Sequence, residues 1–319
     1  IPEQIVFTGV GKTTAELVQA IELGVKTINS ESAGEIERIN QLASARGVRA
    51  RIALRVNPDI DARSHPHIST GLKTNKFGIP MESVKEICRR FAQAPGVEIV
   101  GLHIHVGSQI TDLEPLRKAS EAIVALAREL RDMGVSIDHV DLGGGLGISY
   151  DGSPVPSAKD YAAVLLPAVK DSGFKLILEP GRNIVAPAGV LLSRVIDVKE
   201  QPGGPVFVIL DAGMTELIRP MLYNAFHRIE HVEGVDRPEI VCDVVGPLCE
   251  TSDTLGKARR LARPEPGDLM VIRDAGAYGA VMASNYNRRL MPAEMLVDGD
   301  KAEVIKRRQT IDDLLALEV

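Results

Sequence analysis

The chain has 319 residues, of which 45% are hydrophobic and 25% are charged, and its formal net charge is −6. This composition is typical of a globular protein, and the acidic balance gives no reason to expect nucleic acid or an anionic membrane as a partner. Three cysteines, an odd number in a long chain, argue against a disulfide framework and favour the cytoplasm. No apolar run reaches the roughly 18 residues that cross a bilayer.

The first part of the chain alternates short apolar strands with amphipathic helical segments. The two clearest helices span residues 31–45 and 116–133, and Asp112 and Gly134 are suited to the start and the end of the second one. Strict alternation predicts a parallel sheet that is either doubly wound or closed into a barrel. The predicted strands cover residues 5–8, 27–29, 51–56, 99–106, 139–142 and 176–178.

The number of strands bears on the choice between these two folds. Six strand–helix units can be identified up to residue 186, whereas a closed α/β barrel needs eight. A barrel therefore requires two further units before residue 1, while an open six-stranded sheet requires none.

The segment after Pro187 has a different pattern, rich in short strands and tight turns. This pattern predicts a mostly antiparallel second domain over residues 187–319, with a short helix near its end at residues 310–317. The predicted strands cover residues 190–199, 206–211, 240–245, 269–274 and 294–297.

The most informative stretch is residues 139–147. An apolar strand ends here and is followed directly by Gly143, Gly144 and Gly145. Such a turn can point backbone N–H groups at an anion, most often a phosphate, at the carboxyl end of a parallel strand. A tight turn with nothing bound explains the same residues equally well.

Polar side chains also follow other predicted strands. His103 and His105 lie on the same face of a strand because side chains alternate, and lining a barrel is the favoured interpretation of His103. Ser108 comes close behind and could reach a phosphate. Glu179 and Arg182 follow the sixth strand. A surface salt bridge is one explanation of this pair, but an acid that is buried there needs a charged or protonated partner.

Cys249 and Glu250 follow an apolar strand in the second part of the chain. A cysteine outside a disulfide is usually a small buried hydrophobic residue. Here the thiol lies in a turn beside two acidic residues, which favours a chemical role.

Together and in this order, these segments resemble the meso-diaminopimelate decarboxylases of the fold-type III pyridoxal-phosphate family. The likeness extends over essentially the whole chain and includes Phe7–Lys12, Gly71–Gly78, Tyr278–Gly279 and Ser284–Asn287. It implies decarboxylation of meso-diaminopimelate to L-lysine with pyridoxal 5'-phosphate. It also implies an α/β barrel over residues 1–186, a β-domain over residues 187–319, and a homodimer with shared active sites.

The resemblance also assigns residues to the cofactor and to the substrate. His105 is expected to stack on the pyridine ring, Glu179 to face the ring nitrogen, and Cys249 to protonate the carbon after CO₂ leaves. Glu250 is expected to bind the distal ammonium of the substrate, and it reaches the site with Cys249 from across the dimer interface. The cofactor-binding set comprises His105, Ser108, Gly143, Gly144, Gly145, Glu179, Arg182 and Tyr278, and the substrate-binding set comprises Arg182, Arg219, Tyr223, Glu250 and Tyr278.

One departure from the family pattern concerns the Schiff-base lysine, which the family carries in a Tyr-Ala-x-Lys-Ala-Asn-like motif on the first barrel strand. This sequence contains no such motif, and Lys12, Lys73 and Lys76 belong to other segments. With the strand count, this predicts a missing N-terminal segment of on the order of 100 residues. We therefore expect this chain alone to decarboxylate poorly or not at all.

Two other functions remain compatible with the sequence. One is a decarboxylase of the same fold that acts on another basic or carrier-bound amino acid. The other is a non-catalytic relative that binds pyridoxal phosphate or a partner subunit, which the absent lysine favours and the retained Cys249, Glu250 and Arg182 oppose.

Overall fold

The computed structural model describes residues 1–61 and 75–319. The family-like residues 71–74 and Lys73 therefore lie outside the described residues. The chain separates into two compact units, an N-terminal unit of residues 1–148 and 154–182 and a C-terminal unit of residues 149–153 and 183–319. Each unit is described by itself.

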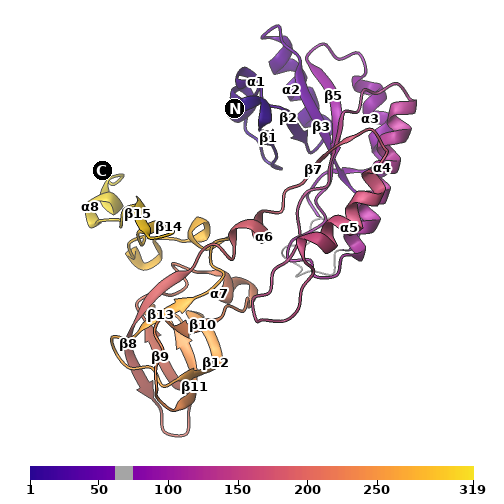
Figure 1. Cartoon of the computed structure of the whole chain (residues 1–319). Coiled ribbons are helices and arrows are strands. Elements are labelled where there is room, and N and C mark those ends of the chain that lie inside the picture. Colours follow the sequence, from indigo (N-terminus) through magenta and orange to yellow (C-terminus); the bar gives the residue numbers. More distant parts are fainter. Residues whose placement is uncertain (62–74) are drawn as a thin grey trace. The chain divides into compact units, whose positions relative to one another are not determined.

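The N-terminal unit is built on a curled parallel sheet (Figure 1). Six strands pair with their neighbours in chain order, and a short seventh strand, β4, pairs with β3 beside this path. Sequential order is that of an α/β barrel, whereas a doubly wound sheet reverses its order at one point. The barrel prediction is therefore confirmed over the open doubly wound sheet. The strands are β1 (Val6–Phe7), β2 (Thr27–Ser30), β3 (Ala50–Asn57), β4 (Ile79–Pro80), β5 (Val97–His103), β6 (His139–Asp141) and β7 (Lys175–Ile177).

The helices of this unit begin and end where local capping permits. Helix α1 begins after Thr13, whose side chain forms a capping box with Glu16. Before α4, Asp112 accepts a hydrogen bond from the Glu114 amide at 3.0 Å, and Gly134 follows the helix with φ +88°. The helices are α1 (Thr14–Leu23), α2 (Ala33–Ser44), α3 (Val84–Phe91), α4 (Glu114–Asp132) and α5 (Ala158–Val169), with short 3₁₀ turns at Pro2–Gln4 and Met81–Ser83.

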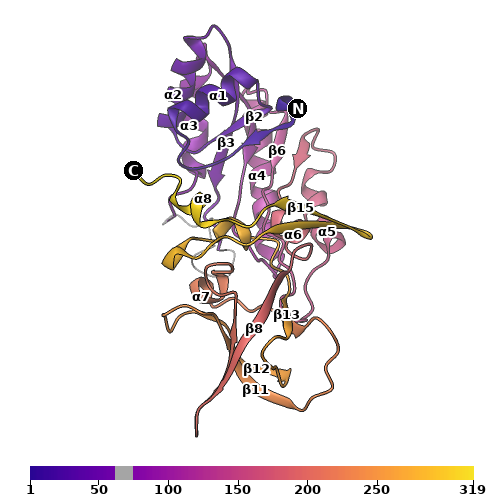
Figure 2. The same ribbon diagram turned by 90° about the vertical axis from the view of Figure 1, so that its left-hand side faces the viewer.

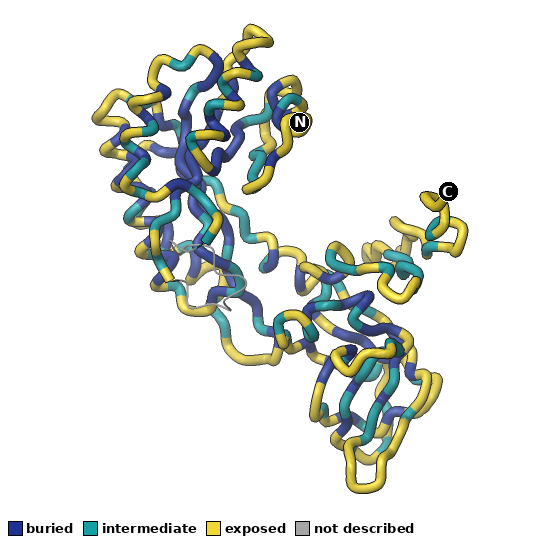
Figure 3. The backbone as a smooth tube through the Cα atoms, turned by 180° about the vertical axis from the view of Figure 1, so that it is seen from behind, coloured by how far each residue is buried: buried dark blue, intermediate teal, exposed yellow. Residues whose placement is uncertain are grey.

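The two faces of the sheet differ in chemistry. One face packs against the helices and is apolar, with Ile52, Leu54 and Val140 all fully buried. Because side chains alternate, the other face carries Arg55, His103 and Asp141 instead. Figure 3 shows the buried residues in the interior of this unit and the exposed residues around its outside. The polar face ends at the carboxyl edge of the sheet, where an α/β barrel places its active site.

The C-terminal unit contains a six-stranded sheet in the order β10-β13-β8-β9-β11-β12, in which every pairing except β9–β11 is antiparallel. A separate hairpin joins β14 and β15 (Figure 2). The predicted mostly antiparallel character is therefore confirmed. The strands are β8 (Leu191–Glu200), β9 (Val206–Leu210), β10 (Ile229–His231), β11 (Glu239–Val245), β12 (Thr254–Ala262), β13 (Leu269–Ile272), β14 (Glu294–Asp298) and β15 (Lys301–Lys306).

Three of these strands, β10, β12 and β15, were not predicted from the sequence. β10 has only three residues, β15 is exposed along its whole length, and β12 carries Lys257, Arg259 and Arg260. None of them shows the apolar pattern on which a strand prediction depends. The boundary between the two units falls within helix α6 (Gly181–Val185), after Arg182. The other helices of the C-terminal unit are α7 (Arg219–Tyr223) and α8 (Ile311–Leu315), with 3₁₀ turns at Ala280–Met282 and Tyr286–Arg288. Throughout the described chain, every helix is too short or too polar to cross a bilayer.

Candidate active site

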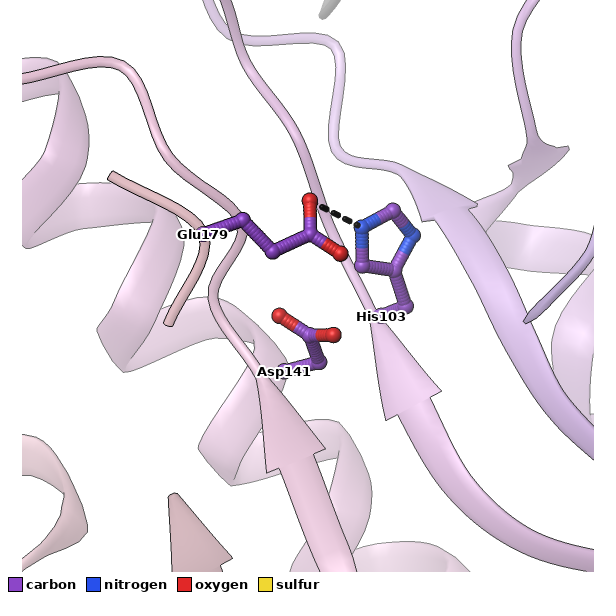
Figure 4. A group of neighbouring side chains, drawn as sticks. All are labelled: His103, Asp141 and Glu179. Carbon is purple, nitrogen blue, oxygen red and sulfur yellow. Dashed lines mark ion pairs between the residues drawn. The ribbon is translucent and has the colours of Figure 1, made fainter. Parts of the chain in front are cut away.

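Three ionisable side chains meet at the carboxyl edge of the parallel sheet (Figure 4). His103 ends β5, Asp141 ends β6, and Glu179 follows β7 by two residues. His103 and Asp141 are paired across neighbouring strands, so their side chains share one face. His103 Nε2 lies 3.7 Å from Glu179 Oε2. One imidazole nitrogen of His103 and one carboxylate oxygen each of Asp141 and Glu179 lie within 4.8 Å of one another.

Burial and mutual contact shift the pKa values of the two carboxyl groups, Asp141 and Glu179. His103 and Asp141 are fully buried, whereas 34% of the Glu179 side chain is exposed. Burial raises the pKa of Asp141 to about 6, and the nearby Glu179 adds to this effect. Burial opposes the ionisation of Glu179 as well, but the adjacent His103, an ion-pair neighbour at 3.7 Å, outweighs it, so the pKa of Glu179 lies below its usual value.

His105 continues the same face beyond β5 and is neutral at physiological pH. Burial is the main reason that its pKa falls to about 4, and the neighbouring His103 and Arg55 lower it further. Its Nδ1 accepts a hydrogen bond from the Gly144 amide at 3.2 Å, which leaves the hydrogen on Nε2.

The glycine turn after β6 is packed closely against the neighbouring strand ends. A Cβ at Gly143 would lie 2.3 Å from the Ile104 carbonyl oxygen, and one at Gly144 would lie 2.1 Å from the Glu179 carbonyl oxygen. Gly143 and Gly145 also have φ of +67° and +113°. Backbone packing alone therefore requires glycine at these positions, which agrees with the interpretation of the stretch as a tight turn.

The same turn retains part of its capacity to bind an anion. The Gly143 and Gly144 amides donate to Asp141 Oδ1 and His105 Nδ1. Within residues 1–61 and 75–319, the Gly145 amide donates to no acceptor. Asp141 is the functional candidate that the sequence did not single out. Its signal was an acid at the end of an otherwise apolar strand, the same signal that marked Glu179.

Ser108 and Arg182 lie together at this edge of the sheet. Arg182 is buried, and its Nε and Nη2 donate to Ser108 Oγ at 3.3 and 3.1 Å. Because the hydroxyl oxygen is the acceptor in both bonds, its own hydrogen remains able to donate to a ligand. A positive guanidinium and a hydroxyl donor are suited to an anionic group.

Lys12 is held in a different place on the N-terminal unit. Its Nζ lies 2.7 Å from the carbonyl oxygens of Gly9 and Asn29 and 3.2 Å from the Glu35 carboxylate. Burial lowers the pKa of Lys12, while Glu35 partly restores it. Lys12 is therefore part of a buried structural network, which agrees with its exclusion as a cofactor lysine.

A second group of predicted residues lies on the C-terminal unit. Cys249 and Glu250 are exposed in the turn that follows β11. Asn287 Nδ2 lies 3.3 Å from Cys249 Sγ, and the Tyr286 hydroxyl donates to the Glu250 carboxylate. Tyr286 and Asn287 belong to a segment that resembles the family, but no role was predicted for either of them from the sequence.

This turn is fixed by a buried acid that sequence reasoning missed. The Asp253 carboxylate accepts hydrogen bonds from the amides of Met214 at 2.6 Å and Leu248 at 2.8 Å. Gly213 and Gly246 pack so closely that a Cβ on either would lie within 2.6 Å of this carboxylate. Asp253 thereby determines the path of the chain on both sides of Cys249.

Arg219, Tyr223 and Tyr278 also belong to the C-terminal unit. Arg219 is buried at the start of α7, with Nη1 2.7 Å from His227 Nε2 and its guanidinium 4.7 Å from the Tyr150 ring centroid. Tyr223 is half-buried at the end of α7. Tyr278 is 41% exposed and has φ +60°.

A match to a protein-family model defines the class of enzyme to which the chain belongs. Residues 1–186 match the family model described as "Pyridoxal-dependent decarboxylase, pyridoxal binding domain". This match covers more than half of the chain, and it coincides with the barrel-type sheet and its polar edge. The class is therefore a pyridoxal-dependent decarboxylase, with pyridoxal 5'-phosphate as cofactor.

Individual relatives then define the family within this class. A diaminopimelate decarboxylase of Neisseria meningitidis serogroup A is 49% identical over 98% of this chain and 77% of its own length. One from Pseudomonas aeruginosa is 46% identical over 99% of this chain and 75% of its own length. The crystal structure of diaminopimelate decarboxylase from Helicobacter pylori complexed with L-lysine has a TM-score of 0.95 and 42% identity, covering 99% of this chain and 79% of that one. The chain belongs to the diaminopimelate decarboxylase family, and it spans about three quarters of the length of these relatives.

Proposed function

We propose that this protein converts meso-diaminopimelate to L-lysine and CO₂ with pyridoxal 5'-phosphate as cofactor. The observation that carries the proposal is the identity of 42–49% to diaminopimelate decarboxylases over nearly the whole chain. The H. pylori relative is seen in complex with L-lysine, the product of this reaction.

The residues at the edge of the sheet fit the cofactor. A Cβ on Gly143, Gly144 or Gly145 would collide with neighbouring backbone, so the turn stays bare, and the Gly145 amide has no acceptor among the described residues. These backbone groups, with the Ser108 hydroxyl and the Arg182 guanidinium, would hold the phosphate. When bound, the cofactor supplies an electron sink for the bond that breaks.

Glu179 and His105 are the residues we assign to the ring of the cofactor. Glu179 has a lowered pKa and is ionised at neutral pH, so its carboxylate can keep a proton on the ring nitrogen. His105 has a pKa of about 4 and is neutral, so it can lie against a cationic ring without repulsion. Its bond from Gly144 fixes the ring orientation.

Most of the residues we assign to the substrate belong to the C-terminal unit. Arg219 and Tyr223, together with Arg182 and Tyr278, would bind the distal carboxylate, for which a guanidinium is suited. Glu250 would bind the distal ammonium, and the exposed Cys249 thiol would deliver a proton to the carbon that loses CO₂.

We further propose that two copies form a homodimer with shared sites, each supplying Cys249 and Glu250 to the other. The β14–β15 hairpin supports this, since Leu296, Val297 and Ile305 are all more than half exposed and an isolated hairpin is marginally stable. We propose residues 1–186 and 187–319 as the two domains. The cytoplasm is proposed as the location, in keeping with three unpaired cysteines.

Product formation tests the proposed function. Residues 1–319 alone, without the Schiff-base lysine motif, are expected to form little or no lysine. The activity measurements therefore use these residues joined to a family segment that carries this motif, here called the motif-complemented protein. It is supplied with pyridoxal 5'-phosphate and incubated separately with meso-diaminopimelate, ornithine and arginine, and the amine products are measured by mass spectrometry. We expect lysine from meso-diaminopimelate and no product from the other two. Preferential turnover of ornithine or arginine would identify a different decarboxylase of the same fold.

A further inference from the structure

Glu179 is contacted by two buried ionisable groups that the proposed reaction leaves without a role. His103 and Asp141 are both fully buried, on the face of the sheet that the helices do not cover. His103 Nε2 lies 3.7 Å from Glu179 Oε2, and the Asp141 carboxylate lies within 4.8 Å of both (Figure 4).

Ordinary structural needs do not account for this pair. Asp141 Oδ1 accepts a hydrogen bond from the Gly143 amide at 2.9 Å, but Asp141 Oδ2 has no hydrogen-bond partner among the described residues. The same holds for both ring nitrogens of His103. Buried polar atoms without hydrogen-bond partners lower the free energy of unfolding. Their presence beside Glu179 therefore points to a functional use.

The geometry decides which carboxyl of the pair takes a proton. Two carboxylates this close do not both ionise without a large electrostatic penalty. Asp141 is fully buried, whereas Glu179 is partly exposed and lies nearer to the His103 imidazole. The proton is thus better placed on Asp141, and the raised pKa of Asp141 and lowered pKa of Glu179 have the directions that this requires.

We propose that His103 and Asp141 are positioning residues for Glu179, which fix the direction of its carboxylate and keep it ionised. Asp141 does this by holding the shared proton, and His103 by presenting its imidazole to Glu179 Oε2. The inference rests on the proposed function, because a role for an ionised Glu179 depends on its facing the cofactor ring.

Three other charged or titratable groups lie near this cluster, namely His105, Tyr161 and Arg55. His105 on the same chain segment has a pKa of about 4, and burial raises the pKa of Tyr161 on α5 to about 12. Arg55 on β3 is held by Glu31 at 2.6 Å. The His103→Asn variant separates the titration of His103 itself from that of the carboxyl pair, Asp141 and Glu179.

Carboxyl ¹³C NMR of the full chain, labelled in Asp and Glu, locates the proton without cofactor or activity. The resonances of Asp141 and Glu179 are assigned by their loss in Asp141→Asn and Glu179→Gln. We expect Asp141 to titrate near pH 6 while Glu179 stays ionised at that pH. Protonation of Glu179 before Asp141 would overturn the proposal, and this result does not depend on any variant's activity.

Cofactor affinity, measured by fluorescence titration with pyridoxal 5'-phosphate at a pH below about 6, where Asp141 holds its proton and Glu179 is ionised, tests the positioning role. We expect His103→Asn and Asp141→Ala to raise Kd about tenfold, because each removes a buried polar group that holds the Glu179 carboxylate in place. Asp141→Asn should stay within about twofold of the wild type, because its amide reproduces the donor and acceptor of a protonated Asp141.

His139→Asn is the matched control. His139 is also fully buried and on the same face, and neither of its ring nitrogens has a hydrogen-bond partner among the described residues. Its ion-pair neighbour is Asp138, at 3.9 Å, instead of Glu179. An equal loss of affinity in His139→Asn and His103→Asn would show a general disturbance of the barrel and would contradict the inference. Unchanged affinity in Glu179→Gln would instead refute the assignment of Glu179 to the ring, whatever the NMR titration shows.

Discussion

The Glu179 carboxylate is the residue on which the proposed chemistry depends most directly. It lies at the end of a strand, next to a glycine turn and the buried imidazole of His103. Partial burial opposes its ionisation, but its pKa is nevertheless below the usual value, so the carboxylate remains ionised. A carboxylate in such a site stabilises positive charge more strongly than one in water, because the surroundings screen it less.

Replacing Glu179 by Gln keeps the size of the side chain and removes its charge. We expect kcat for lysine formation to fall by about 10²-fold or more, the scale on which a preorganised electrostatic group acts. Steady-state assays measure the change. Glu129→Gln, which alters an exposed carboxylate on α4, serves as the control and should leave kcat unchanged.

His227 makes stability depend on pH. Its Nδ1 donates to the Arg273 carbonyl oxygen at 2.8 Å, and its Nε2 accepts from Arg219 at 2.7 Å, so the neutral tautomer is fixed. Burial lowers the pKa of His227 to about 4 from 6.5. The folded state therefore resists a proton that the unfolded state takes up, and stability is lost as pH falls from 6.5 toward 4.

Denaturant unfolding of the C-terminal unit between these pH values measures this effect. The free energy of unfolding should decrease on acidification, and His227→Gln should make the decrease shallower by up to about 1.4 kcal/mol per pH unit. An unchanged slope in His227→Gln would show that His227 is not the group that titrates.

At the scale of elements, the glycine turn after β6 joins the fold to the site. A methyl group on Gly144 would meet the Glu179 carbonyl oxygen at 2.1 Å. Gly144→Ala should therefore reduce the free energy of unfolding by about 1–3 kcal/mol, as overpacking does, and should weaken the binding of pyridoxal 5'-phosphate.

Gly11→Ala is the control for this substitution. A Cβ at Gly11 meets nothing within 4 Å, and Gly11 does not have a positive φ. Its stability, followed by thermal unfolding, should remain within about 0.5 kcal/mol of the wild type. If both variants lost stability equally, close packing of the turn would not be the cause.

The elements of the barrel were predictable because their signals are local. Buried strands such as β3 and helices such as α4 carry apolar residues at regular spacing, and Gly134 marks the end of α4. β4, with two residues, has no such pattern. The exposed β15 and the charged β12 were missed for the same reason, since their pairing partners, and not their own sequence, make them strands.

The site was predictable only in part. Residues at strand ends, such as Glu179 and His105, follow from the topology of a parallel sheet. The pairing of His103 with Glu179 depends on register between strands more than 70 positions apart, which the sequence pattern does not contain. Asp253 was missed because its partners, the amides of Met214 and Leu248, are backbone groups.

At the scale of the whole molecule, the proposed homodimer makes each active site depend on two copies. Glu179→Gln and Cys249→Ala chains, each inactive alone, are mixed and allowed to exchange subunits. If each copy supplies Cys249 to the other, one site in every heterodimer has neither substitution. The mixture should then regain about a quarter of wild-type activity at equal amounts.

The control value for this experiment is the sum of the activities of the Glu179→Gln and Cys249→Ala chains, each assayed separately. Activity of the mixture that equals this sum would contradict sharing of the site between copies. Heterodimer formation is verified by native mass spectrometry with differently labelled chains, so that failed exchange is recognised before activity is interpreted.

The central claim is that the protein releases CO₂ from meso-diaminopimelate and leaves L-lysine. The most direct measurement is the mass-spectrometric quantification of lysine formed by the motif-complemented protein with added pyridoxal 5'-phosphate, with Glu179→Gln in parallel. We predict lysine that increases with time and protein concentration and falls by about 10²-fold in the variant. Lysine formed equally by both proteins, or product from ornithine or arginine in place of meso-diaminopimelate, would contradict the account.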